Sequence, residues 1–165
     1  MEPENNIEMI IKGYLASASK YPLMIIGNTS NNFGINMKNK YSASNIIFPG
    51  AIYDPVINNN LRYHAAIYFH GHSVGGTNPS LLEAMACQSN ISAHNNIFNQ
   101  HVLGDDADYF SSSMDIAAII NSSANNPVTK LRNENNLDKI KTTYNWPKII
   151  NSYEELMLNS LSGRR

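Results

Sequence analysis

AAIYFHGHSVGGTNPSLLEAMA, residues Ala65–Ala86, is the stretch that predicts the fold of this chain. It begins with an apolar strand at Ala65–His70, passes through a loop with two adjacent glycines, and enters a helix at Asn78 and Pro79. Asparagine is a favoured N-cap, and proline suits the first helical position because its missing N–H would have no partner there. A strand that leads through glycines to a helix start presents free amides and the positive end of the helix dipole to an anion. A tight turn that simply needs glycine is the alternative explanation.

Composition and charge narrow the class of protein. The chain has 165 residues, 42% of them hydrophobic and 15% charged, which suits one folded domain over residues 1–165. The net charge of −1, without a basic stripe, argues against a nucleic-acid partner. The single cysteine, Cys87, excludes an internal disulfide and is most simply a small buried residue. Because no apolar run approaches the roughly 18 residues that span a bilayer, and the first residues lack signal-peptide features, we expect a cytoplasmic protein without a transmembrane segment.

Apolar runs alternate with longer amphipathic ones along the chain. The predicted strands are Leu23–Gly27, Asn45–Phe48, Ala65–His70, Asn90–Ser92 and Ala107–Phe110. The predicted helices are Ile7–Ser19, Phe33–Tyr41, Pro55–Tyr63, Pro79–Cys87, Ile97–Leu103, Met114–Ser123, Val128–Tyr144 (opening at Pro127) and Trp146–Leu161. This alternation implies crossover connections, and hence an α/β fold with a parallel, Rossmann-like sheet, flanking helices and extra helices at the C-terminal end. Ligands of such sheets bind beyond the carboxyl ends of the strands, where the Gly71–Asn78 loop would lie.

Three groups of residues are interpreted as structural. Clusters of asparagine are expected in loops and at helix ends, namely at Asn31-Asn32, Asn58–Asn60, Asn95-Asn96 and Asn135-Asn136. The aromatic residues Tyr63, Tyr68 and Phe69 are expected in the core of the sheet. The acidic turn of Asp105, Asp106 and Asp108 is expected to be a solvated loop.

Residues Gly71–Gly75, GHSVG, match the G-x-S-x-G motif of serine hydrolases and follow a strand. That motif requires a helix almost immediately after the serine, whereas the glycines and proline after Ser73 delay the helix. The expected chain order of serine, acid and histidine is also poorly met, because His94 and His101 precede every later aspartate and leave only Glu83 as the acid. A hydrolase that uses Ser73 is therefore the less favoured alternative.

The spacing of His70 and His72 would point both imidazoles to the same side of an extended strand. With His64 nearby they suggest a metal site, but no further ligand is clearly placed, so a polar strand end at a pocket is preferred and no metal is predicted. Either imidazole is suited to donate a hydrogen bond to a bound anion. Glu83 lies one turn into the helix, where a carboxylate gains from the helix dipole. Alternatively, its two oxygens would accept hydrogen bonds from the neighbouring hydroxyls of a ribose.

The segment Gly75–Ala86, GGTNPSLLEAMA, resembles the donor-site signature of the retaining, GT-B-fold glycosyltransferases of family 4. The likeness extends to Phe48–Ile52, at the family's third strand near the nucleotide base, to His94–Phe110 and to Glu2–Tyr14. In all it covers most of Glu2–Asn121 and is closest to a rhamnosyltransferase-like subgroup that makes bacterial surface polysaccharides.

The resemblance implies that the chain is the C-terminal, donor-binding half of such an enzyme. The parent enzyme would transfer a sugar from a nucleotide-diphosphate donor to a glycan or lipid-linked glycan, and the donor is a substrate rather than a cofactor. Glu83 matches the glutamate that holds the donor ribose, and no catalytic residue is assigned. The other implied donor-binding residues are Gly75, Gly76, Thr77, Asn78 and Ser80, with Gly50 near the base and His70 or His72 in support.

The sequence departs from the family pattern at several positions. Gly75 stands where the family places a second glutamate, and Asn5 stands where it places a phosphate-gripping lysine. The matching arginine, the first strand and the N-terminal acceptor domain would all lie upstream of Met1, as if the chain began at an internal methionine. We therefore expect the chain alone not to transfer sugar. We also expect marginal stability, or self-association through the gap left by the strand. A binding module without chemistry, for a nucleotide or a glycan, is the alternative.

Overall fold

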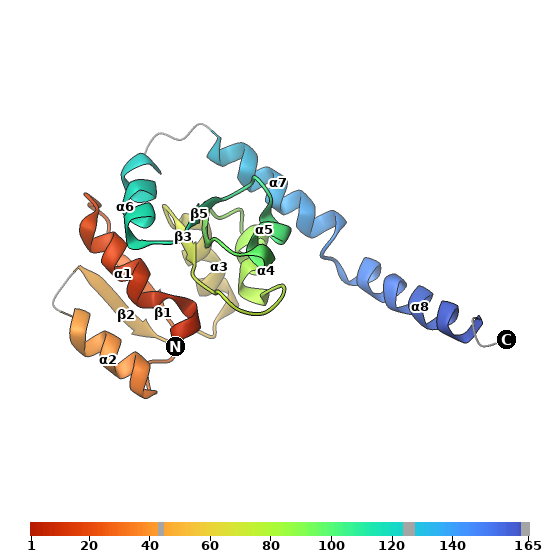
Figure 1. Ribbon diagram of the computed structural model, residues 1–165, viewed down its shortest axis with the longest axis horizontal. Helices are drawn as coiled ribbons and strands as arrows, with labels where there is room; N and C mark the ends of the chain where they lie inside the picture. The colour runs from red at the N-terminus through yellow and green to blue at the C-terminus, as the bar shows by residue number, and fades with distance from the viewer. Residues whose placement is uncertain (43–44, 124–127, 163–165) are drawn as a thin grey trace.

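The fold is α/β, as Figure 1 shows for the computed structural model, which describes residues 1–42, 45–123 and 128–162. The strands are β1 (Leu23–Ile26), β2 (Ile46–Gly50), β3 (Tyr68–His70), β4 (Ile91–His94) and β5 (Asp108–Phe110). The helices are α1 (Ile7–Ala16), α2 (Asn32–Tyr41), α3 (Pro55–His64), α4 (Pro79–Ala86), α5 (Ile97–Leu103), α6 (Ser113–Ser122), α7 (Thr129–Thr142) and α8 (Trp146–Ser162). Each predicted strand and helix is thus confirmed, with shifts at the ends. The short 3-10 helix η1 (Pro3–Asn5) was not predicted, and Pro127 lies outside the described residues.

All strand pairs are parallel, as predicted, but the strands form two sheets. One sheet has the order β1-β2, with Leu23 opposite Ile46. The other has the order β3-β4-β5, with Tyr68 opposite Ile91. Strand pairing is therefore interrupted between β1 and β3.

Side-chain caps explain where the helices begin. The N-cap side chains of α2, α3, α4 and α5 each accept hydrogen bonds from amides of the first turn, which would otherwise have no partner. Ser112 forms a capping box with Asp115 at the start of α6. Asparagine supplies three of these caps, at Asn31, Asn78 and Asn96. The expectation that asparagine marks helix ends is thus confirmed at Asn31 and Asn96.

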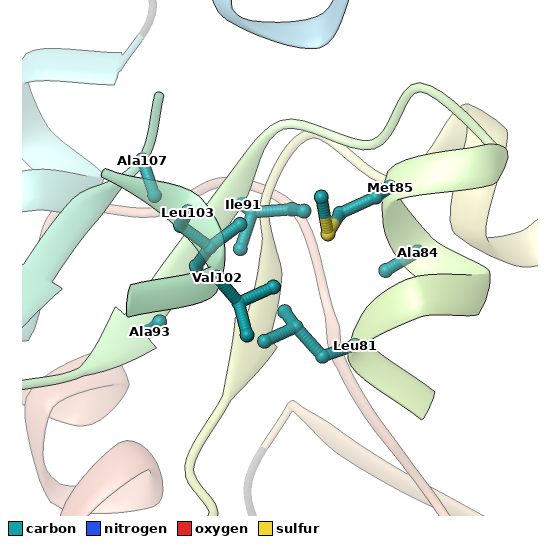
Figure 2. Packing of buried hydrophobic residues seen from close by; sticks show 8 residues of the cluster. All are labelled: Leu81, Ala84, Met85, Ile91, Ala93, Val102, Leu103 and Ala107. Atoms are coloured by element: carbon teal, nitrogen blue, oxygen red, sulfur yellow. The ribbon is translucent and has the colours of Figure 1, made fainter. Parts of the chain in front are cut away.

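The core of the three-stranded sheet is packed between β4, α4 and α5. Figure 2 shows side chains from these elements meeting over the sheet. Leu81 and Met85 of α4, Ala93 of β4 and Leu103 of α5 are all 0% exposed. Such complete burial is what a parallel sheet requires, because both of its faces must be covered by apolar side chains.

Helix α1 connects the two sheets. Ile7, Ile11 and Tyr14 pack with Ile25 of β1 and with residues of α2. Ile10, on the same helix, packs with Phe110 of β5 and Ile116 of α6 in a separate cluster. Helix α6 lies along α1, and Figure 1 shows the pair side by side.

Several expectations about surface and core are wrong. Tyr63 is 58% exposed on α3, because that helix buries none of its residues, whereas Tyr68 and Phe69 pack into the cores. Cys87 is only half-buried. Asn58–Asn60 lie inside α3 rather than in a loop.

The acidic turn before β5 is solvated at Asp105, whereas Asp106 and Asp108 bind α7, so the expectation of a solvated loop is wrong for those two residues. Asp106 pairs with Lys139 at 2.7 Å and Asp108 with Arg132 at 2.8 Å. Asn136, which was expected in a loop, is buried in the middle of α7 and donates to the carbonyl of Asp106 at 2.8 Å. Helix α7 is thus attached to the turn before β5 largely by ion pairs and hydrogen bonds between residues about 24 to 33 positions apart in sequence.

Helix α8 projects away from the rest of the protein, beyond α7 (Figure 1). Its apolar side chains are exposed, including Trp146 at 75% and Leu161 at 70%. Among the helices that the structure describes, none combines the length and the apolar character needed to cross a membrane.

Candidate functional site

The Gly71–Asn78 loop lies at the carboxyl end of β3 and leads directly into α4. The Asn78 Oδ1 accepts hydrogen bonds from the Ser80 amide at 3.0 Å and from the Ser80 hydroxyl at 2.7 Å. Asn78 itself has an extended backbone, and Pro79 occupies the first turn. The predicted strand, loop and capped helix are therefore present, and the first-turn amide at Ser80 is already used by the cap.

The first half of this loop is held by the N-terminal segment of the chain. The carbonyl of Glu4 accepts from the Ser73 amide at 3.0 Å and from the Ser73 hydroxyl at 3.1 Å. The Asn6 side chain donates to the Gly71 carbonyl at 2.8 Å. A Cβ atom at Gly71 would collide with the backbone of Asn5, so only glycine fits there. The local sequence around the loop gave no signal of this support, because the contacts join residues more than sixty positions apart.

The second half of the loop is open. Residues Val74 to Thr77 are exposed, and within the described residues the amides of Gly75, Gly76 and Thr77 have no protein acceptor. Gly75 has a φ of +82°, which favours glycine. At Gly76 the φ is not positive, and a Cβ atom would meet nothing within 4 Å. Neither the backbone nor its protein neighbours therefore require glycine at position 76.

His70, at the end of β3, and His72, in the loop, have different environments. His70 is 4% exposed, and its Nε2 lacks a hydrogen-bond partner among the described residues. Burial, and the nearby charge of His72, lower the pKa of His70 to about 4, so its imidazole is neutral at pH 7. His72 is half-buried, with its Nδ1 at 3.3 Å from the Asn5 Oδ1 and its ring centre at 6.3 Å from that of His70. His72 is thus the more accessible of the two imidazoles.

Glu83 lies on α4, one turn after the loop, with its side chain 55% exposed. Its Oε2 pairs with the Arg62 guanidinium of α3 at 2.5 Å, and the Arg62 side chain is only 13% exposed. Local sequence patterns could not predict this partner, because it lies 21 positions away on another helix. No hydrogen bond in the described part of the chain engages the other carboxylate oxygen. Glu83 therefore faces α3 with one oxygen and has one left to bind a ligand.

Gly50 ends β2, in the other sheet. Its φ is +89°, and its carbonyl accepts from the Gly27 amide at 3.0 Å. No hydrogen bond in the ranges that the structure covers joins Gly50 to the Gly75–Ser80 segment. The structure therefore places the two histidines and the loop at the carboxyl end of β3 and Glu83 one turn into α4, and leaves Gly50 at the end of β2 in the other sheet.

The geometry around Ser73 lacks the features of a serine nucleophile. Its hydroxyl donates to the Glu4 carbonyl rather than to an imidazole. The helix does not begin until Pro79, so the sharp strand-to-helix turn of a hydrolase is missing. The Nδ1 atom of His94, the nearest histidine after Ser73 in sequence, lies 3.3 Å from the side-chain Nδ2 of Asn96. Its partner is thus Asn96 rather than Ser73.

A metal centre is not indicated either: outside residues 43–44, 124–127 and 163–165, no three His, Cys, Asp or Glu side chains gather closely enough to hold an ion. A separate groove of about 520 Å³ lies between the first turns of α1 and α6. Its charged residues are already paired, Lys12 with Glu8 at 3.4 Å and Glu8 also with Lys40 at 2.8 Å. The groove therefore has no free charge to offer a phosphate.

A scan against protein-family models finds no match for this chain, and no curated protein matches it.

Proposed function

We propose that this chain is the nucleotide-sugar-binding half of a retaining glycosyltransferase with two Rossmann-like halves. One observation carries the proposal: where β3 leads to α4, the amides of Gly75, Gly76 and Thr77 have no acceptor among the described residues. Free amides at the start of a helix favour a diphosphate, because the amides and the helix dipole both present positive charge. The resemblance of Gly75–Ala86 to the family's donor site supports the same reading.

Each residue of the site then has a chemical role. The free amides of Gly75, Gly76 and Thr77 stabilise the negative charge that develops on the leaving diphosphate, whereas the Ser80 amide is already used by the Asn78 cap. The imidazole of His72, at the base of the loop, adds a hydrogen-bond donor. Glu83 accepts from the ribose hydroxyls with the oxygen that Arg62 leaves free, and Arg62 fixes the orientation of the carboxylate. The parent enzyme would transfer the sugar to a glycan or lipid-linked glycan in polysaccharide synthesis.

A binding module without chemistry is the second candidate. Gly75 favours it, because a glycine with a φ of +82° occupies the position where the family has its sugar-contacting glutamate. In that case the chain holds a nucleotide-sugar or a glycan as part of a larger assembly. Both candidates use the same donor site, and they differ in whether the larger assembly that contains this chain transfers the sugar.

Calorimetric titration with UDP-, GDP- and dTDP-sugars tests the donor site. Gly76→Val is the most informative variant, because a Cβ atom at this position meets nothing within 4 Å and the larger side chain enters the space above the loop. We expect Gly76→Val to weaken binding at least tenfold. Glu83→Gln should weaken it by about tenfold or more, because a hydrogen bond to a charged group contributes about 1.5–3 kcal/mol. Glu155→Gln, on the exposed face of α8, is the matched control and should leave binding unchanged.

The absence of saturable binding to any of these sugars, or equal binding by all three variants, would contradict the proposal. A sugar-transfer assay on the same protein tests its assignment as a half-enzyme: we expect no turnover by this chain alone, and detectable turnover would contradict that assignment. Labelling of Ser73 by a fluorophosphonate would instead favour the hydrolase.

A further inference from the structure

The two carboxylate oxygens of Glu83 have different surroundings. Oε2 lies 2.5 Å from Nη2 of Arg62, which reaches across from α3. Oε1 accepts no hydrogen bond from any residue that the structure describes. The Arg62 side chain is mostly buried and the Glu83 side chain is more than half exposed, so the part of this ion pair that a ligand can reach belongs to Glu83.

Arg62 is held in place by more than this ion pair. Its Nη1 donates to the Asn59 Oδ1 at 3.3 Å, and its backbone carbonyl accepts from the Ser89 hydroxyl at 3.1 Å. Burial raises the pKa of Tyr68 and the Arg62 charge counteracts this rise, so the guanidinium lies near that hydroxyl. Removing the carboxylate from a mostly buried guanidinium would leave the cation without its counter-charge, which is costly. Oε2 of Glu83 therefore stays paired with Arg62 when a ligand binds.

This pairing changes how Glu83 can hold a pentose. A carboxylate with both oxygens free accepts one hydrogen bond at each oxygen from the neighbouring 2′- and 3′-hydroxyls of a ribose. With Oε2 paired to Arg62, only Oε1 is free for this contact, and a single hydroxyl is enough to supply its donor.

The exposure of Glu83 reduces the penalty for a missing hydroxyl. A site rejects an analogue strongly when the missing group leaves a buried polar atom without a partner. Glu83 is instead more than half exposed and Arg62 balances its charge, so water can replace a hydroxyl that is absent. The 2′-hydroxyl therefore contributes little to affinity as long as the 3′-hydroxyl remains.

We propose that the donor site accepts nucleoside diphosphates of ribose and of 2′-deoxyribose alike, and that Arg62 sets this tolerance. Arg62 is a positioning residue, because it acts on the ligand only by withholding one oxygen of Glu83. The inference rests on the proposed function, since it requires that the amides before α4 hold the diphosphate and that Glu83 reaches the pentose.

Calorimetric titration of the full chain with matched nucleoside diphosphates tests the inference. The ribose, 2′-deoxyribose and 2′,3′-dideoxyribose forms are compared with the same base, chosen as whichever of uracil, guanine and thymine binds. We expect the dissociation constants of the ribose and 2′-deoxyribose forms to agree within about threefold. The dideoxy form leaves Oε1 without a hydroxyl donor and should bind about tenfold more weakly or worse.

Arg62→Met tests the role of the arginine, because methionine keeps much of the apolar stem and removes the charge. With both oxygens of Glu83 free, the preference for ribose over 2′-deoxyribose should rise to about tenfold. A purely structural loss would weaken both forms by the same factor and leave this ratio unchanged. Arg132→Met is the matched control, since Arg132 also pairs with a carboxylate, that of Asp108, and the ratio should stay as in the parent chain.

A preference of tenfold or more for ribose in the parent chain would overturn the inference and leave the proposed function in place. Equal binding of all three forms, or an unchanged ratio in Arg62→Met, would overturn it as well. The absence of saturable binding by every form would instead contradict the proposed function itself.

Discussion

The two sheets of this protein differ in how completely they are covered. Around β3, β4 and β5, residues such as Leu81, Met85 and Leu103 are entirely buried. Around β1 and β2, Met24 and Ile47 remain 40% and 43% exposed, although one face of that sheet is packed against α1 and α2. The strands of the two sheets have similar apolar sequences. The three-stranded sheet nevertheless has a fully buried core, whereas one face of the β1–β2 sheet remains exposed, so the difference comes from how the helices cover each sheet.

The candidate site belongs to the well-packed three-stranded sheet of β3, β4 and β5. The loop, the two histidines and α4 all extend from β3, whose neighbour β4 carries the fully packed core. A rigid sheet under the loop holds its amides in fixed positions, which is what recognition of a diphosphate requires. The incompletely covered sheet is where we expect lower local stability.

The largest expected difference between the sheets is in the cost of truncating an apolar side chain. Leu81→Ala should lower the free energy of unfolding by about 3–4 kcal/mol, because it removes a fully buried side chain and leaves a cavity. Met24→Ala should cost less than about 1 kcal/mol, because that side chain is already 40% exposed. Urea denaturation of both variants measures the contrast. Equal losses would mean that the two sheets are equally well packed.

Acidification should lower the free energy of unfolding through His70, at the end of β3 in the three-stranded sheet. Its pKa falls to about 4 in the folded state from an ordinary value of 6.5, so the unfolded chain binds more protons between these values. Stability present above pH 6.5 is therefore lost as the pH falls toward 4, by up to about 3 kcal/mol. Burial also lowers the pKa of His94, which adds to the same trend.

Denaturation curves at pH 7, 6, 5 and 4.5 check this expectation. His70→Gln should flatten the pH dependence, whereas His64→Gln, at the end of α3, should leave it as in the parent chain. The same slope in both variants would show that His70 is not the group responsible.

The packing of α1 against α6 should be sensitive to one added methyl group at Gly13, and stability should fall when it is added. A Cβ atom at Gly13 of α1 would lie 2.5 Å from the Ile116 Cβ and 2.7 Å from the Ser113 carbonyl oxygen of α6. Gly13→Ala should therefore destabilise by about 1 kcal/mol, even after the gain in helix propensity. Gly76→Ala is the control, because its Cβ meets no atom within 4 Å. Stabilisation by Gly13→Ala would mean that the two helices are farther apart than described.

The smallest expected effect concerns the attachment of α7 to β5 of the three-stranded sheet. Arg132→Gln removes the pair with Asp108, and we expect it to cost less than about 1 kcal/mol, since both side chains remain partly solvated. Lys130→Gln, whose pair with Glu134 is at 3.9 Å and largely exposed, should cost almost nothing. Thermal unfolding of the two variants compares them. A larger loss in Lys130→Gln would contradict the role given to the acidic turn.

Local sequence predicted the elements well because the signals are local. Asn31, Asn78 and Asn96 cap helices within three residues of themselves, and Pro55 and Pro79 fix first turns. The order of strands is a different matter, since β1 and β3 have ordinary strand sequences and nothing in either says that they do not pair. The same holds for the site: the loop was predictable, whereas the pairing of Glu83 with Arg62 and the burial of His70 depend on contacts between distant segments.

If this chain holds a nucleotide-sugar as proposed, the amides before α4 bind its diphosphate. An NMR titration of the nitrogen-15-labelled chain with UDP, GDP and dTDP tests it most directly. With at least one of these nucleotides, we expect the amide signals of Gly75, Gly76 and Thr77 to shift saturably and further than those of the β1–β2 sheet. Saturable shifts confined to other residues, or none with any of the three nucleotides, would contradict it.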